Sequence, residues 1–130
     1  MMVTEWSFPS TDTGLPCLHG AGQRYFCQSA RVAASEVFAT MMMRVPFLVG
    51  YDYFKWLDDP AEGYGPTFRE DCNYGLLNLR DEPYESLVAM FGRIHASVNE
   101  IRRSPPPVAD QTSLRFADGV EKFKARLDAL

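Results

Sequence analysis

An uninterrupted apolar run directly after a helical pattern constrains the fold of this chain more than any other feature. The run is Phe47-Leu48-Val49-Gly50-Tyr51, and the link Arg44-Val45-Pro46 separates it from a helical pattern over residues 24–43. A strand without polar alternation is typical of a parallel sheet that is buried on both faces. Pro46 disfavours helical geometry at Val45 and closes the helix. This order of elements indicates an α/β fold.

The connections between the elements differ in length in a regular way. Residues 1–5 read as a first short strand, and residues 6–23 form a long loop with several Gly and Pro residues. The second strand is followed by another long loop, residues 52–74. Long loops thus follow the strands and a short link follows the first helix, as in α/β barrels, which build function on the loops after the strands. We predict a partial TIM (β/α)8 barrel, made of the last two strand–helix units plus a C-terminal helix.

Two helical patterns supply apolar faces that could cover the strands. The first face comprises Phe26, Ala30, Ala33, Val37 and Met41. The second face comprises Leu87, Val88, Phe91, Ile94, Val98 and Ile101. Asp81 offers an N-cap for the second helix, with Pro83 in its first turn.

The chain divides into two expected parts. Residues 1–103 form the barrel portion, and residues 104–130 form a linker with a Pro-rich start and an amphipathic helix. A complete barrel needs eight strand–helix units in about 250 residues, so we interpret the chain as the closing part of one. It opens directly on a strand, which suggests that further units precede it.

Composition narrows the classes of partner. Hydrophobic residues make up 46% and charged residues 23% of the 130-residue chain, which is the balance of a globular protein. The net charge is -4 without a basic cluster, so we expect no nucleic-acid partner. No apolar stretch is long enough to span a bilayer, and we expect no membrane partner. No signal peptide is visible either, which leaves the location open.

The three cysteines do not form a recognisable motif. Cys17, Cys27 and Cys72 include no Cys-x-x-Cys pair, so neither a zinc site nor a redox pair is supported. We expect three free thiols and no cofactor. Cys17 together with His19 is the alternative, a partial metal site.

The two long loops carry residue types that suit glycoside hydrolysis. Retaining enzymes use two carboxyl groups about 5–5.5 Å apart, and sugar rings pack on aromatic side chains. The candidate carboxylates are Glu5, Asp12, Asp52 and Asp58; the candidate platforms are Trp6, Tyr53 and Trp56; His19 and Asn73 could bind hydroxyls. Each also has an ordinary reading: the Trp residues as core or rim packing, Asp58 as the start of a turn, and His19 as an exposed loop residue.

Two stretches carry a resemblance to a known family. The string Thr4-Glu5-Trp6-Ser7-Phe8-Pro9, followed by Asp12-Thr13-Gly14 and His19-Gly20, resembles the seventh-strand region of β-agarase-type glycoside hydrolases, retaining barrel enzymes of clan A. Residues 46–58 resemble the family's eighth strand, and Asn73-Tyr74-Gly75-Leu76 resembles its following Gly-turn. The likeness spans residues 2–103.

The resemblance implies roles for individual residues. Glu5 would be the nucleophile, Tyr53 would stand where the family has a Trp platform, Asp58 would be a hydroxyl ligand or its supporting partner, and His19 would contact substrate. Tyr53 and Lys55 depart from the pattern and suggest a sugar other than agarose. The family's acid/base Glu follows the fourth strand, and no acid of this chain matches it.

Three functional hypotheses follow. The first is a glycoside hydrolase-like fragment that carries the nucleophile for retaining hydrolysis of a polysaccharide or oligosaccharide and is inactive without the missing acid/base residue. The second is a non-catalytic module that binds carbohydrate or a protein partner. The third is an inactive truncated product that self-associates through exposed barrel edges.

Overall fold

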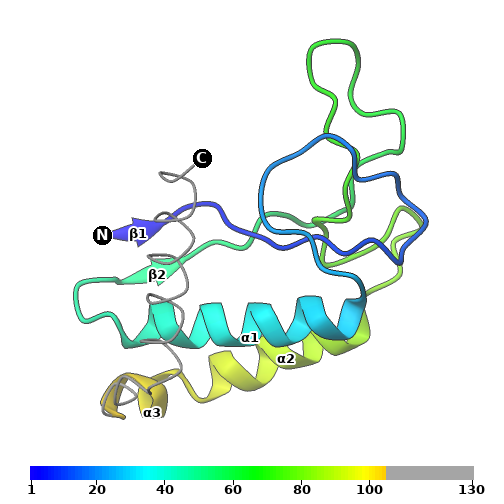
Figure 1. Cartoon of the computed structure of the whole chain (residues 1–130). Helices are drawn as coiled ribbons and strands as arrows, with labels where there is room; N and C mark the ends of the chain where they lie inside the picture. The colour runs from blue at the N-terminus through cyan, green and yellow to red at the C-terminus, as the bar shows by residue number, and fades with distance from the viewer. Residues whose placement is uncertain (105–130) are drawn as a thin grey trace, which may run out of the picture.

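The computed structural model describes residues 1–104 of the chain. Two short strands and three helices follow one another as β1 (Met2–Val3), α1 (Gln28–Arg44), β2 (Gly50–Tyr51), α2 (Glu85–Ala96) and α3 (Val98–Arg103). Figure 1 shows the strands side by side above α1 and α2. The predicted amphipathic helix beyond the Pro-rich linker lies outside the described residues. No helix within residues 1–104 is long and apolar enough to cross a bilayer.

The two strands pair in parallel, as the sequence predicts. Met2 lies opposite Gly50, and Val3 lies opposite Tyr51. The pairing continues past the ends of the regular strands, because the Phe54 N–H donates to the Trp6 carbonyl at 2.9 Å. The α/β class is therefore confirmed, although the regular strands are shorter than residues 1–5 and 47–51.

The core lies between the strands and the helices. Its buried residues are Trp6, Ala39, Met42, Met43, Leu48, Leu87, Met90, Phe91 and Ile94. Trp6 is at its centre, with the Phe38 ring at 4.8 Å and the Tyr53 ring at 5.2 Å between ring centroids. α1 and α2 pack against each other and close the core from below (Figure 1). This packing sets where the segments after β1 and β2 leave the core.

The predicted buried face of the first helix is wrong. Phe26 is 91% exposed, and Val37 and Met41 are also exposed. The face that points inward carries Arg31, Ser35, Ala39, Met42 and Met43. Arg31 can occupy an inward position because its guanidinium finds hydrogen-bond acceptors there, and buried polar groups with partners are tolerated.

The second helical pattern is divided and starts later than expected. α2 begins at Glu85 and α3 ends at Arg103, with Ser97 between α2 and α3. Asp81 is not the N-cap, because its φ of 59° places it in the left-handed region of a turn. The Asn78 side chain holds this turn by accepting from the Arg80 N–H at 2.8 Å. Asn and Asp suit such turns, and this signal competes with the capping signal.

Candidate functional site

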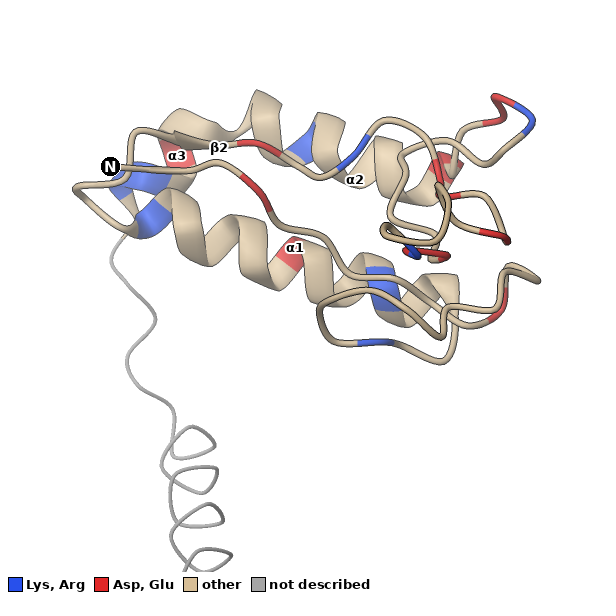
Figure 2. Cartoon of the chain, turned by 90° about the horizontal axis from the view of Figure 1, so that it is seen from above, with Lys and Arg blue, Asp and Glu red and all other residues tan. Residues whose placement is uncertain are grey.

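The loops that follow β1 and β2 meet at one end of the molecule, away from the N-terminus (Figure 1). The Ser10 N–H donates to the Asn73 Oδ1 at 2.7 Å, and the Cys17 N–H donates to the Asp71 carbonyl at 3.1 Å. The Tyr74 hydroxyl donates to the Ala21 carbonyl at 2.6 Å. Many of the described acidic residues lie on these loops (Figure 2). The two loops therefore form one unit.

A disulfide between Cys17 and Cys72 joins the same two loops, which corrects the expectation of three free thiols. The two cysteines are 55 positions apart in the sequence, so no local motif predicts that they form a disulfide. Cys27 is free. The alternative pairing of Cys17 with His19 at a metal is also wrong, because the Cys17 sulfur is already bonded. In the described part of the chain, no group of three or more His, Cys, Asp or Glu side chains is placed to hold a metal ion.

Glu5 lies at a hollow that both loops line. It lies two residues after the last residue of β1, with Thr4 between them, and is exposed. The hollow has a volume of about 170 Å³ and is lined by Glu5, Trp6, Ser7, Ala21, Gly22, Phe54, Glu70 and Tyr74. An exposed carboxylate, three aromatic side chains and exposed backbone around a hollow could accommodate part of a sugar ring.

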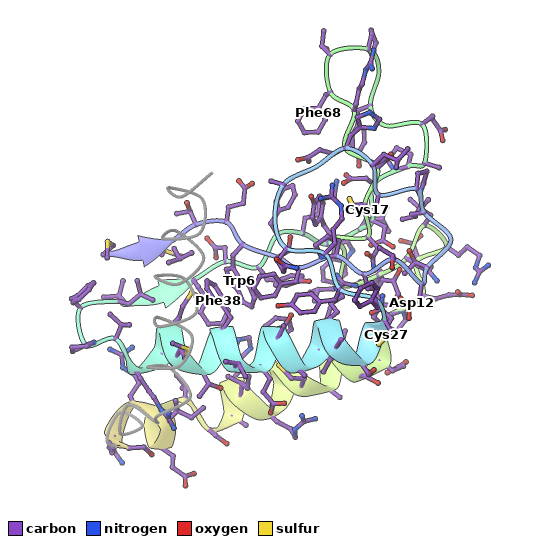
Figure 3. All side chains as sticks on the ribbon, viewed as in Figure 1. Trp6, Asp12, Cys17, Cys27, Phe38 and Phe68 are labelled. Atoms are coloured by element: carbon purple, nitrogen blue, oxygen red, sulfur yellow. A yellow bond between two sulfur atoms is a disulfide. The ribbon has the colours of Figure 1, made fainter. Side chains whose placement is uncertain are left out.

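The two aromatic residues expected closest to the sugar have different environments. Trp6 is 8% exposed and belongs mainly to the core, although it also lines the hollow. Figure 3 shows Trp6 beside Phe38 above α1. The Tyr53 hydroxyl accepts a hydrogen bond from the Arg31 guanidinium at 2.9 Å, and burial raises the pKa of Tyr53. Tyr53 is not among the residues that line the hollow.

Asp58 and Asn73 are buried and brace the loops. The Asp58 carboxylate accepts from the Gly75 N–H at 2.8 Å and from the Tyr84 hydroxyl at 2.5 Å. Burial raises the pKa of Asp58. Asn73 is fully buried against Ser10. In the described structure both side chains are thus engaged within the protein, and their predicted roles toward a sugar stay predictions.

His19 and Trp56 are exposed but lie outside the hollow of Glu5. Trp56 is 68% exposed. His19 lines a different depression, where its Nδ1 lies 3.3 Å from the Asp71 carboxylate. Asp12 caps α1, because its carboxylate accepts from the Gln28 N–H at 2.9 Å. The structure thus brings Glu5 and Trp6 together at the hollow, with Tyr53 packed behind Trp6 in the core. The other predicted site residues do not line the hollow, and their ligand roles stay predictions.

Sequence reasoning missed two residues near the hollow. Glu70 lines it, although a Glu in a long loop carries no signal that would single it out. Arg31 is fully buried and donates to both Tyr53 and the Gly75 carbonyl. From sequence alone, an Arg within a helical pattern is expected to be exposed. The structure shows instead that Arg31 is buried and joins α1 to the segment after β2.

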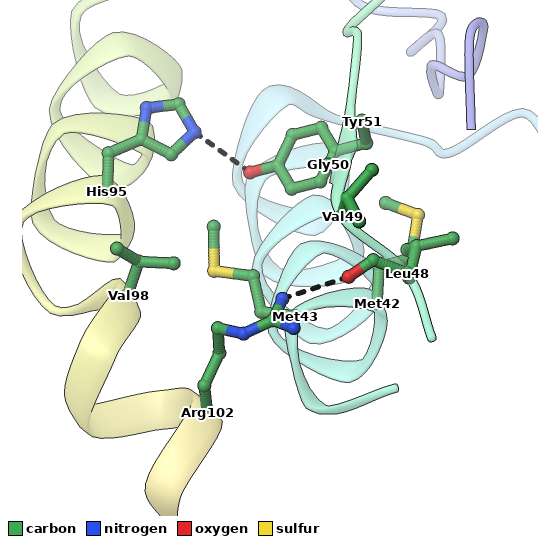
Figure 4. Close-up of a pocket in the computed structure, with 9 residues that line it drawn as sticks. All are labelled: Met42, Met43, Leu48, Val49, Gly50, Tyr51, His95, Val98 and Arg102. Carbon is green, nitrogen blue, oxygen red and sulfur yellow. Dashed lines mark hydrogen bonds between the residues drawn. The ribbon is translucent and has the colours of Figure 1, made fainter. Parts of the chain in front are cut away.

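A second hollow of about 170 Å³ lies at the other end of the strands (Figure 4). The Tyr51 hydroxyl and the His95 Nε2 are 3.0 Å apart across it, and Arg102 donates to the Leu48 carbonyl at 3.0 Å. Met42 and Met43 form much of the rest of its wall. These contacts hold α2 and α3 against β2 and the segment that leads into it.

The Asp71 carboxylate should make the stability of the loop unit depend on pH. Burial favours the neutral form, but hydrogen bonds from His19 outweigh it and lower the pKa of Asp71 below 3.8. The stabilisation is therefore fully present above that value and is lost as the pH falls through the lowered pKa. We expect D71N to lower the free energy of unfolding by about 1.5–3 kcal/mol at pH 7. Urea unfolding from pH 7 to pH 2 should show this difference shrinking at the acid end. E62Q, at an exposed position on the same loop, is the control and should show no such trend.

Several solved structures that are similar to this chain carry the names of GH50 enzymes or of agarases. The agarase AgWH50C shares 26% identity over 75% of this chain, with a TM-score of 0.68. BpGH50 shares 33% identity over 78% of this chain, with a TM-score of 0.66. PfGH50B has a TM-score of 0.67 at 23% identity over 77% of this chain, a likeness that concerns the fold alone. The predicted resemblance to a segment of β-agarase-type glycoside hydrolases is confirmed.

The match covers a small part of each neighbour. This chain spans 14% of the length of AgWH50C and of PfGH50B, and 20% of the length of BpGH50. No protein-family model and no curated protein sequence matches the chain.

Proposed function

We propose that this chain forms the last two strand–helix units of a (β/α)8 barrel in a retaining glycoside hydrolase, with Glu5 as the nucleophile. The observation that carries the proposal is the position of Glu5: an exposed carboxylate just beyond β1, at a hollow built by both loops. Parallel strands followed by long loops, and the likeness to agarases at 26–33% identity, support the barrel interpretation.

The chemistry assigns Glu5 the first step. Its carboxylate attacks the anomeric carbon, the glycosidic bond breaks, and a covalent glycosyl ester forms. A second carboxyl group protonates the leaving oxygen and then activates the water that hydrolyses the ester. In the family this second group follows the fourth strand of the barrel. None of the described residues corresponds to that strand. The proposal therefore requires a polypeptide segment that supplies it.

Agarose is the first substrate to test, because the neighbouring structure AgWH50C, at 26% identity, is named as an agarase. In the sequence, Tyr53 and Lys55 depart from the family pattern and suggested a sugar other than agarose. However, the Tyr53 hydroxyl accepts from Arg31, and the Lys55 ammonium pairs with Asp59 and with the Tyr64 hydroxyl at 2.9 Å. Neither residue lines the hollow, which supports keeping agarose as the first substrate to test.

A trapping experiment tests the nucleophile without the missing acid. A dinitrophenyl 2-deoxy-2-fluoro-β-galactoside has a leaving group that departs without protonation, so Glu5 alone can form the glycosyl ester. We expect the intact chain to gain the mass of one fluorosugar, mapped to the peptide that contains Glu5. E5Q should gain none. D52N, at the exposed carboxylate that follows β2, should be labelled like the wild type. Equal labelling of E5Q and the wild type would refute the assignment.

A second candidate is a module that binds a partner or another copy of itself. The described residues leave the outer edges of β1 and β2 unpaired, and Met2, Phe47 and Val49 are exposed beside them. Unpaired strand edges favour pairing with another chain. The same trapping experiment separates the candidates, because a binding module would leave Glu5 unlabelled.

A further inference from the structure

Glu70 is a second carboxylate at the hollow of Glu5, and it comes from the other loop. Building on the proposed function, we propose that Glu70 is a specificity-determining residue. It accepts hydrogen bonds from hydroxyl groups of a neutral sugar held against Glu5, and it excludes sugars that carry sulfate or carboxylate groups. The resemblance to agarases assigns no role to this position.

The backbone that carries Glu70 is held firmly on its C-terminal side. The next residue, Asp71, donates its N–H to the His19 carbonyl at 3.2 Å and accepts at its own carbonyl from the Cys17 N–H at 3.1 Å. Cys72 is fixed by the disulfide to Cys17. These contacts fix where the backbone places Glu70 relative to the loop after β1, and a defined position is one requirement of selective recognition.

The charges around the hollow leave the two carboxylates without neutralising partners. Among residues 1–104, neither Glu5 nor Glu70 has an ion-pair partner. The nearby Lys55 ammonium is engaged by Asp59 and by the Tyr64 hydroxyl. The Arg24 guanidinium donates to the Cys17 and Gly20 carbonyls. Among the described residues, the side chains that line this hollow include two carboxylates and no lysine or arginine, so an anionic sugar entering it would contact like charges.

Electrostatics show that Glu70 experiences the charge of Glu5. Burial is the largest cause that raises the pKa of Glu70, followed by the charge of Asp59, which Lys55 partly offsets. Glu5 contributes a further rise. Like charges that interact in this way would also repel a sulfate placed between them.

The rest of the lining matches a neutral sugar. Trp6, Phe54 and Tyr74 contribute aromatic surface, which suits the apolar C–H faces of a sugar ring. Two ionised carboxylates act as acceptors only, and hydroxyl groups are donors that can satisfy them. Apolar walls combined with unpaired acceptors select for a ligand rich in hydroxyls and free of negative charge.

Binding of matched oligosaccharides to the full chain tests the inference. The probes are a neutral agaro-oligosaccharide and a sulfated galactan oligosaccharide of equal length, titrated by NMR. We expect the wild type to bind the neutral probe at least about tenfold more tightly. E70Q keeps the shape and removes the charge, so it should lose most of this preference by gaining affinity for the sulfated probe. E62Q changes a carboxylate on the same loop outside the hollow and should keep the wild-type ratio.

The outcomes are separable from those of the proposed function. Equal affinity ratios in E70Q and E62Q would refute the role of Glu70, as would a folded wild-type chain that binds neither probe. Labelled Glu5 with an unchanged ratio in E70Q would overturn this inference alone. A ratio that changes in E70Q while Glu5 stays unlabelled would support Glu70 and overturn the nucleophile.

Discussion

Replacing Cys17 and Cys72 together by serine is expected to lower the free energy of unfolding by about 4 kcal/mol. The disulfide connects positions 55 residues apart, and a cross-link over such a distance removes much conformational entropy from the unfolded chain. It also joins the two loops that form the hollow of Glu5. Urea unfolding followed by circular dichroism should show the loss, and the hollow should become less ordered in hydrogen exchange.

The third cysteine provides a matched control. Cys27 is free, and C27S should leave the free energy of unfolding nearly unchanged. Wild-type protein treated with a thiol reductant should behave like the double serine variant. If the double variant were as stable as C27S, the disulfide would not contribute to the stability of the folded chain.

Replacing Arg31 by methionine is expected to lower the free energy of unfolding by about 3–5 kcal/mol. Arg31 is fully buried, donates to the Gly75 carbonyl at 2.8 Å and to the Tyr53 hydroxyl at 2.9 Å, and lies 5.0 Å from the centre of the Tyr84 ring. Its charge also lowers the pKa of the buried Asp58, working against the dominant effect of burial. Methionine fills similar space but leaves these groups without the cation. Thermal and urea unfolding measure the loss.

An exposed arginine separates this effect from a general loss of charge. Arg80 pairs with Glu82 in an exposed position, and R80M should lower the free energy of unfolding far less than R31M does, because exposed ion pairs contribute little. A double-mutant cycle between R31M and Y53F should show coupling, because the two side chains share a hydrogen bond. Equal losses in R31M and R80M would contradict the bracing role of Arg31.

The order of the elements could be predicted from the sequence, and their inward faces could not. The apolar run at residues 47–51 and the closing Pro46 correctly indicated a helix followed by a parallel strand. The face of α1 was wrong because apolar spacing pointed to Phe26 and Val37, whereas the inward positions include Arg31 and Ser35. The spacing of apolar residues predicts a buried face only from apolar side chains. It cannot identify a polar side chain that is buried because it forms hydrogen bonds in the core.

Only part of the candidate site could be predicted, because the sequence does not show which polar loop residues become buried. Glu5 stood out because it follows a strand and precedes a long loop, and the structure places it at a hollow formed by both loops. Asp58 and Asn73 stood out as polar loop residues, yet both are buried as braces. Glu70 carried no signal. Whether a loop carboxylate faces a ligand or a backbone N–H depends on the other loop, which a single stretch of sequence does not contain.

The sequence by itself determined the alternation of strands and helices, because hydrophobic spacing and proline act on neighbouring residues. It also determined the likeness to agarases, which rests on the order of short motifs. The tertiary structure alone decided the Cys17–Cys72 disulfide, the buried Arg31 and the meeting of Glu5 with Glu70 at one hollow. Each of these joins residues far apart along the chain, and such contacts exist only once packing has brought the two loops together.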